Sequence, residues 1–292
     1  MESGLLEIHL KVPFLSAIGS SVLSFFVFPF DVLNTLSKIK TEHIEVKSLI
    51  KDVYKDYGLK GFYKGGSMIV YEIFPMYFVY YSSYNYLNGK LWQMLEDRKY
   101  KQKWAIPLVS SCLSELSCMA FYIPLDTVMT RMQSMSPQYN YTSLWDGLKS
   151  IYKNEGVIRF YYSSHIFVTY CLILTMVQFT TYEWMKALYQ HRLKKKEFGT
   201  LESMIATVLS TSSAVLVTHP LNTLVVQHQM INLEKCGNET TIQLLKREFK
   251  EHKLKVFTRS VGLRMTNLNA FGLSSIPLFE FLRQKYGVDV EF

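Results

Sequence analysis

The sequence predicts an all-α membrane protein in which six transmembrane helices form three pseudo-symmetric repeats, each with a short interfacial helix. The first observation is the composition, since 49% of the 292 residues are hydrophobic, 15% are aromatic and only 19% are charged. These values suit a membrane bundle whose interior is partly wet. The second is a set of six apolar stretches. Each is longer than the length of about 20 residues that a helix needs to cross a hydrocarbon layer of ~30 Å. The third is a proline motif that recurs at a nearly constant interval.

The proline motif lies near the end of every second apolar stretch. It reads Pro29-Phe30-Asp31, then Pro124-Leu125-Asp126, then Pro220-Leu221-Asn222, at intervals of 95 and 96 residues. Proline removes a backbone donor and clashes with the preceding turn, so it bends a helix. Repetition at a fixed interval sets the architecture of the whole chain. We therefore divide one membrane domain into the repeats 1–98, 99–197 and 198–292.

Each repeat is expected to contain two membrane spans joined by a connector with a short surface helix. The predicted spans are residues 12–38, 66–93, 104–132, 164–190, 200–229 and 260–286. The connectors contain residues 45–56, 143–153 and 240–250, in which apolar residues recur at helical spacing opposite a charged face. This pattern is typical of helices that lie in a membrane interface.

Two further elements follow each proline motif in register. An acidic-Gly element has its counterparts in Tyr57-Gly58, Glu155-Gly156 and Glu251-His252, and an aromatic-basic-Gly element in Tyr63-Lys64-Gly65, Tyr161-Tyr162-Ser163 and Thr258-Arg259-Ser260. Over essentially its whole length the chain thus resembles the mitochondrial carrier family, whose motif reads Pro-x-(Asp/Glu)-x-x-(Lys/Arg). The resemblance implies a multi-pass protein of the mitochondrial inner membrane, with both termini in the intermembrane space and the connectors in the matrix. The outer membrane, which holds some divergent members, is the alternative location.

The net charge of +8 indicates which partners to expect. The lysines lie mostly in the connectors and no nucleic-acid-binding motif accompanies them, so anionic lipid headgroups, cardiolipin included, are the expected partners. By the resemblance, Tyr63, Lys64, Gly65 and Arg259 are candidate lipid-binding residues. The four cysteines show no paired or zinc-binding spacing, and no phosphate loop or Ser-His-Asp arrangement is present. We therefore expect no enzyme, no metal and no cofactor.

The resemblance also implies a latch on the matrix side. In the family, the acid and the base of each proline motif form ion pairs between helices, which close the protein on that side. The acid positions here are Asp31, Asp126 and Asn222, and the base positions are Asn34, Met129 and Val225. All three bases and one acid are missing, so we expect a latch without cations. A partner or a lipid would then supply cations to Asp31 and Asp126, or the site would stay wet, because unpaired charges in a membrane are costly.

A second gate is implied on the intermembrane side. Its charged positions are Glu183 and Lys186 in the fourth span and Glu280 and Arg283 in the sixth, whereas the second span has Asn85 and Asn88. One ion pair between the fourth and sixth spans can still form, either Glu183 with Arg283 or Glu280 with Lys186. The alternative is that each acid and base form a solvated pair three residues apart on one helix, worth only about 0.2–0.5 kcal/mol.

The family's substrate-contact positions lie seven residues after the glycine of the aromatic-basic-Gly element. Here these substrate positions are Glu72, Tyr170 and Asn267. None is a cation, so an anionic substrate is disfavoured. Glu72 is able to hold a cationic substrate or a proton, because a carboxylate inside a membrane indicates function. The alternative, which we favour for Glu72 and for Glu115 in the third span, is a hydrated or lysine-paired residue without such a role.

Two functions remain open. The first is a transport-deficient carrier fold that acts as a structural or accessory subunit of a larger membrane assembly, such as a respiratory-chain complex, with other membrane-protein subunits as partners. The second is an active mitochondrial solute carrier that exchanges a small neutral or cationic metabolite by alternating access. The missing bases of the latch favour the first interpretation.

Overall fold

The computed structural model describes residues 11–39, 45–96, 105–193, 199–230, 241–252 and 260–286. These residues form helices and turns, and no strand occurs among them. Six long helices correspond to the predicted spans: α2 (Val12–Ile39), α4 (Phe74–Glu96), α5 (Ala105–Gln133), α7 (Ser164–Leu193), α8 (Thr200–Met230) and α11 (Val261–Tyr286). The all-helical fold is therefore confirmed.

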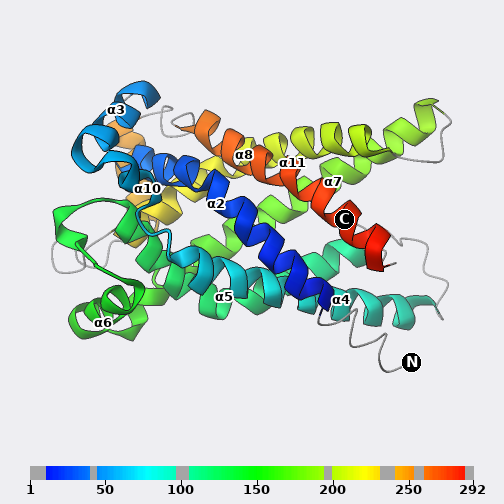
Figure 1. The fold of residues 1–292 in the computed structure, drawn as a ribbon, viewed down its shortest axis with the longest axis horizontal. Helices are drawn as coiled ribbons and strands as arrows, with labels where there is room; N and C mark the ends of the chain where they lie inside the picture. The colour runs from blue at the N-terminus through cyan, green and yellow to red at the C-terminus, as the bar shows by residue number, and fades with distance from the viewer. Residues whose placement is uncertain are drawn as a thin grey trace.

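The long helices form a closed ring. Each packs against its neighbour in the chain, in the order α2, α4, α5, α7, α8 and α11, and α11 packs against α2 to complete the ring. They run roughly along the long axis of the molecule (Figure 1). The short helices α3 (Val46–Tyr57), α6 (Leu144–Glu155) and α10 (Thr241–His252) gather at one end, which we call the connector end. Helix α2 begins and α11 ends at the opposite end.

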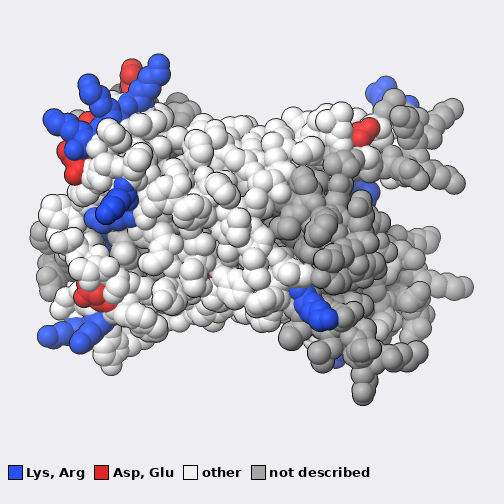
Figure 2. All heavy atoms as spheres, viewed as in Figure 1, with Lys and Arg blue, Asp and Glu red and all other residues white. Residues whose placement is uncertain are grey.

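Four of the long helices are apolar and long enough to cross a membrane. They cover Pro13–Ile39, Ala105–Gln133, Val157–Arg192 and Leu201–Met230. Helices α4 and α11 have the required length, but α4 carries five tyrosines and two asparagines, and α11 carries Arg264 and two asparagines. Figure 2 shows lysine and arginine gathered at the connector end and almost no charge over the middle of the described surface. This uncharged belt fits the hydrocarbon layer.

The three connector helices confirm the predicted surface helices. Helix α3 buries Leu49 and Val53 and exposes its lysines, so it is amphipathic. Helices α3 and α6 each end at the glycine of the acidic-Gly element, where Gly58 has φ +63° and Gly156 has φ +82°. A residue with positive φ is the usual end of an α-helix, and glycine adopts this conformation without strain. The element therefore sets where α3 and α6 stop.

The prolines of the repeat motif lie inside α2, α5 and α8 rather than at their ends. Each helix continues for more than two turns beyond its proline, towards the connector end. These last turns bring the three helices together, since α2, α5 and α8 contact one another as well as their neighbours in the ring. The polar residues on the last turns form the candidate site.

Candidate functional site

A closed ring of polar contacts joins α2, α5 and α8 at the connector end. We call the residue nine positions after each proline the last-turn position. Its side chain contacts the acid position of the preceding repeat, and for the first repeat that is the third repeat. Gln133 Nε2 donates to Asp31 Oδ2 at 2.9 Å, Gln229 Nε2 donates to Asp126 Oδ2 at 2.6 Å, and Lys38 Nζ donates to Asn222 Oδ1. One contact per helix pair thus follows the pseudo-threefold symmetry, and we call these three contacts the latch.

Helical geometry explains why these positions meet. The acid position and the last-turn position are seven residues apart, about two turns, so both side chains project from the same face of the helix. Lys38, Gln133 and Gln229 are each at most 2% exposed. Thr35 Oγ1 donates to Gln133 Oε1 at 2.8 Å, which leaves the amide nitrogen of Gln133 for Asp31. The amide is therefore held in the orientation that the latch needs.

Lys38 supplies the cation that the sequence analysis did not assign to the latch. It lies within electrostatic range of Asp31 and Asp126 in addition to its hydrogen bond with Asn222. The expectation of a latch without any cation is therefore wrong. The base has moved one turn along α2, from position 34 to position 38, so its side chain still projects towards the interior of the ring. That spacing is the signal by which the sequence could have revealed it.

The three base positions are filled differently. Met129 and Val225 are buried in two apolar clusters, the first with Val32, Leu33 and Met132 and the second with Leu224. Asn34 is 4% exposed, and its Oδ1 has no hydrogen-bond partner among the described residues. Apolar packing thus replaces the family's cations at two of the three positions.

Backbone carbonyls at the ends of the latch helices are also satisfied across the ring. Arg131 Nε donates to the carbonyl of Gln229 at 3.0 Å, and Gln227 Nε2 donates to the carbonyl of Lys38 at 2.7 Å. The last carbonyls of a helix have no partner within the helix, so such bonds stabilise its end. Arg131 and Gln227 each lie seven residues after a proline, so both bonds join equivalent positions.

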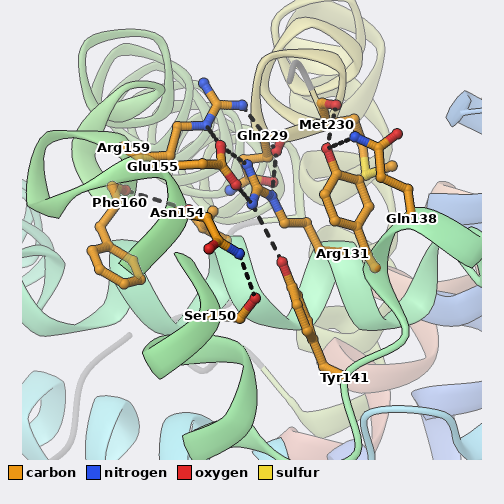
Figure 3. A network of polar contacts seen from close by, with 12 residues as sticks. Arg131, Gln138, Tyr141, Ser150, Asn154, Glu155, Arg159, Phe160, Gln229 and Met230 are labelled. Atoms are coloured by element: carbon orange, nitrogen blue, oxygen red, sulfur yellow. Dashed lines mark hydrogen bonds and ion pairs between the residues drawn. The ribbon is translucent and has the colours of Figure 1, made fainter. Parts of the chain in front are cut away.

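A buried charge cluster holds α6 against the ends of α5 and α8 (Figure 3). Arg131 and Arg159 converge on Glu155, the latter with its Nε 3.0 Å from Oε2. Arg159 also donates to the carbonyl of His228 at 3.2 Å, and Tyr139 donates to that of Met230 at 3.0 Å. Burial raises the pKa of Tyr139, so the side chain remains a hydroxyl donor. The acid of the acidic-Gly element is thus the counter-charge of two arginines.

We expect the substitution Glu155→Gln to destabilise the protein strongly. It leaves Arg131 and Arg159 buried without a carboxylate, and breaking a buried pair in this way costs about 3–5 kcal/mol. The apparent unfolding temperature of the purified protein in detergent should fall by several degrees. Asp56→Asn, which removes an exposed charge on α3, is the matched control. Equal unfolding temperatures for the two variants would contradict this role.

Glu72 is the substrate position with the most unusual surroundings. It lies in the π-helical segment Ile69–Ile73, directly before α4 and Pro75. Proline cannot donate a backbone hydrogen bond, which favours such local widening, and π-helical turns are frequent at functional sites. Glu72 is fully buried, and neither carboxylate oxygen accepts a hydrogen bond from the described residues. Its electrostatic neighbours, Asp126 and Asp31, are both acidic.

The other two substrate positions contact charged residues. Asn267 Nδ2 donates to Asp31 Oδ1 at 3.4 Å, so this position touches the latch. The hydroxyl of Tyr170 accepts a hydrogen bond from Arg264, whose guanidinium lies 5.0 Å from the centre of the tyrosine ring. The sequence pattern did not single out Arg264, which is three residues before Asn267 and therefore on the same side of α11. None of the three substrate positions is itself a cation, but Arg264 brings one into contact with Tyr170.

The gate positions at the opposite end are only partly described. Ser110 Oγ donates to Asn88 Oδ1 at 3.5 Å and so joins α5 to α4. Asn85, Glu183 and Lys186 are partly buried on their helices. The side chains of Glu280 and Arg283 lie outside the described residues. The pairs predicted between the fourth and sixth spans therefore stay predictions.

The candidate lipid-binding residues lie next to α2 and α3. Tyr63 stacks on Phe25 with 5.0 Å between ring centres, and Lys64 Nζ lies 5.2 Å from the ring centre of Tyr57. Gly65 has φ +86°. Arg259 lies outside the described residues. These contacts leave the predicted lipid binding untested.

Comparison with known proteins identifies the family. The sequence profile of mitochondrial carrier protein matches residues 10–95 and 100–193, which is more than half of the chain. A mitochondrial substrate carrier family protein W of Dictyostelium discoideum is 23% identical over 89% of this chain and 82% of its own. The mitochondrial thiamine pyrophosphate carrier 1 of Candida glabrata is 26% identical over 82% of this chain and 77% of its own. The ring of six helices is consistent with this match, and the chain belongs to the mitochondrial carrier family.

Proposed function

We propose that this protein is an active solute carrier of the mitochondrial inner membrane that works by alternating access. In this proposal the connector end faces the matrix, and the latch closes that end. The substrate is a small neutral or cationic metabolite that binds near Glu72, Tyr170 and Asn267. Membrane lipids, cardiolipin included, surround the connector helices.

The closed latch is the observation that carries the proposal. The missing bases at positions 34, 129 and 225 would favour a transport-deficient subunit if no other residues joined the three helices. Lys38, Gln133 and Gln229 make one contact for each pair of helices instead. Since the symmetry of the latch persists with other residues, these contacts support a gate at this end of the protein.

The strength of these contacts suits a gate that has to open. A hydrogen bond between an amide and a charged group contributes about 1.5–3 kcal/mol to stability, and each of the three latch contacts involves one charged side chain. Alternating access requires two states that differ by only a few kcal/mol, so that substrate binding can shift the balance between them. Three such contacts are strong enough to close the protein and weak enough to break.

Reconstitution tests the proposal. Purified protein in liposomes should exchange a radiolabelled metabolite, from a panel of amino acids, amines and neutral metabolites, faster than empty liposomes do. A native gel of mitochondrial membranes solubilised in mild detergent should show the protein running free of any large complex. If no metabolite in the panel is exchanged and the protein migrates at fixed stoichiometry with a large complex, the accessory-subunit interpretation replaces ours.

A further inference from the structure

We propose that Glu115 forms a second cation-binding position inside the ring, on the intermembrane side of Glu72, and that the substrate is a small organic cation with N–H donors. This inference rests on the proposed carrier function and narrows its substrate class. Glu115 belongs to α5, whereas the three substrate positions precede α4 or lie on α7 and α11.

Symmetry places Glu115 on the inner face of α5. It lies nine residues before Pro124, as Ser20 does before Pro29 and Thr211 before Pro220. It also lies eleven residues, three turns, before Asp126, so the two carboxylates project from the same face of α5 about 16 Å apart along the helix. Asp126 faces the latch, and Glu115 therefore faces the same interior nearer the opposite end.

The equivalent positions in the other repeats are neutral and satisfied. Ser20 Oγ lies 3.4 Å from the hydroxyl of Tyr81, and Thr211 Oγ1 accepts a hydrogen bond from Gln178 Nε2 at 3.2 Å. Glu115 is thus the one charged member of this symmetric set. Its hydrogen-bond partner is the thiol of Cys171, a weak donor. Arg264 acts on that thiol, but no lysine or arginine among the described residues is a partner of Glu115 itself. A carboxylate that is not paired with a base attracts a cation from outside.

Tyrosines lie near both Glu115 and Glu72. Tyr77 and Tyr80 of α4 and Tyr170 of α7 lie within electrostatic range of Glu115. Tyr122 of α5 lies within range of Glu72 and of Cys171, the hydrogen-bond partner of Glu115. Aromatic rings and hydroxyls therefore lie near both carboxylates.

Glu72 supplies the independent sign of a missing ligand. It is completely buried, its two oxygens accept no hydrogen bond from the described residues, and its charged neighbours are the acids Asp126 and Asp31. Those two aspartates are already bonded to the amides of Gln229 and Gln133. An ionised carboxylate in such a place is costly unless a positive group pairs with it.

The geometry selects the class of cation. No group of three metal-ligating side chains among the described residues is placed to hold a metal ion. A primary ammonium or a guanidinium fits better, since its N–H groups donate to carboxylates and its charge is attracted to tyrosine rings. Arg264 donates to Tyr170, and Lys38 donates to Asn222, so both bases of this region are engaged within the protein.

Binding to the purified full-length protein tests the inference without a transport assay. The unfolding temperature is measured against rising concentrations of L-arginine, putrescine and agmatine, with malate and citrate as anionic probes. We expect at least one cationic probe to stabilise the protein and the anions to have no effect. Glu72→Gln should abolish the stabilisation, and Glu115→Gln should raise the half-saturating concentration about tenfold. Asp146→Asn, at the exposed start of α6, should leave it unchanged.

Four outcomes would overturn the inference. They are stabilisation by an anion, stabilisation by no cationic probe, an unchanged half-saturating concentration in Glu115→Gln, and a protein whose stability responds to pH through Glu72 and Glu115 but to no organic cation. The proposed function fails separately. Exchange of a neutral metabolite in liposomes would support the carrier function and contradict the cation site. Cation binding without any exchange would support the cation site and contradict the carrier function.

Discussion

Transport is expected to slow about tenfold or more in the variant Asn222→Asp. The new carboxylate would face Lys38, which already donates to Asn222 Oδ1, and would turn the hydrogen bond into a buried ion pair. Close charge pairs in protein interfaces contribute about 1.5–7 kcal/mol, and each 1.4 kcal/mol of added closed-state stability lowers the open population tenfold. The measurement is the initial rate of exchange in liposomes at saturating substrate.

The near-isosteric variant Asn222→Leu is the control for this prediction. It removes the hydrogen bond without adding a charge, so it should destabilise the closed state rather than strengthen it. Exchange rates that change in the same direction for both variants, or that match the unsubstituted protein in Asn222→Asp, would show that this contact does not limit opening.

Replacing Lys38 with methionine is expected to have the second large effect. Lys38 is 1% exposed and is the cation within range of both Asp31 and Asp126. Removal of one partner from a buried charge network costs about 3–5 kcal/mol, because the remaining charges are left without compensation. The apparent unfolding temperature should fall by several degrees, and the matrix side should stay open for a larger share of the time.

A second substitution separates a latch role from a general loss of packing. Asn34→Lys, made in the Lys38→Met chain, returns a base to the position where the family has one and should restore most of the lost stability. Lys47→Met on the exposed face of α3 should have little effect. If Asn34→Lys restores nothing and Lys47→Met is as damaging as Lys38→Met, Lys38 is not a latch residue.

Much of the fold could be predicted because it depends on periodic features. The proline motif predicted the repeats, long apolar stretches predicted the long helices, and amphipathic spacing predicted α3, α6 and α10. Gly58 and Gly156 mark the ends of α3 and α6 because the chain needs positive φ there. These signals are local, so they survive the loss of other family residues.

The latch could not be read from single positions. Which turn of a helix reaches its neighbour depends on how closely the helices approach, and a base shifted by one turn, as in Lys38, serves the same partner. Gln133 and Gln229 are neutral, so a search for charges passes over them, although they hold Asp31 and Asp126.

Arg264 was missed because counting from the glycine element points to Asn267 alone. The surroundings of Glu72 depend on α2 and α5, which are distant in the chain.

Accessibility of a cysteine in the latch tests the central claim most directly. Asn34→Cys would be placed in a chain whose four native cysteines are replaced, and its reaction with a membrane-impermeant maleimide would be followed from the matrix side of inside-out vesicles. Our account predicts slow labelling, at least tenfold slower labelling when Asn222→Asp is added, and at least tenfold faster labelling when Lys38→Met is added. Equal labelling rates in all three chains would contradict a latch that opens and closes through Lys38 and Asn222.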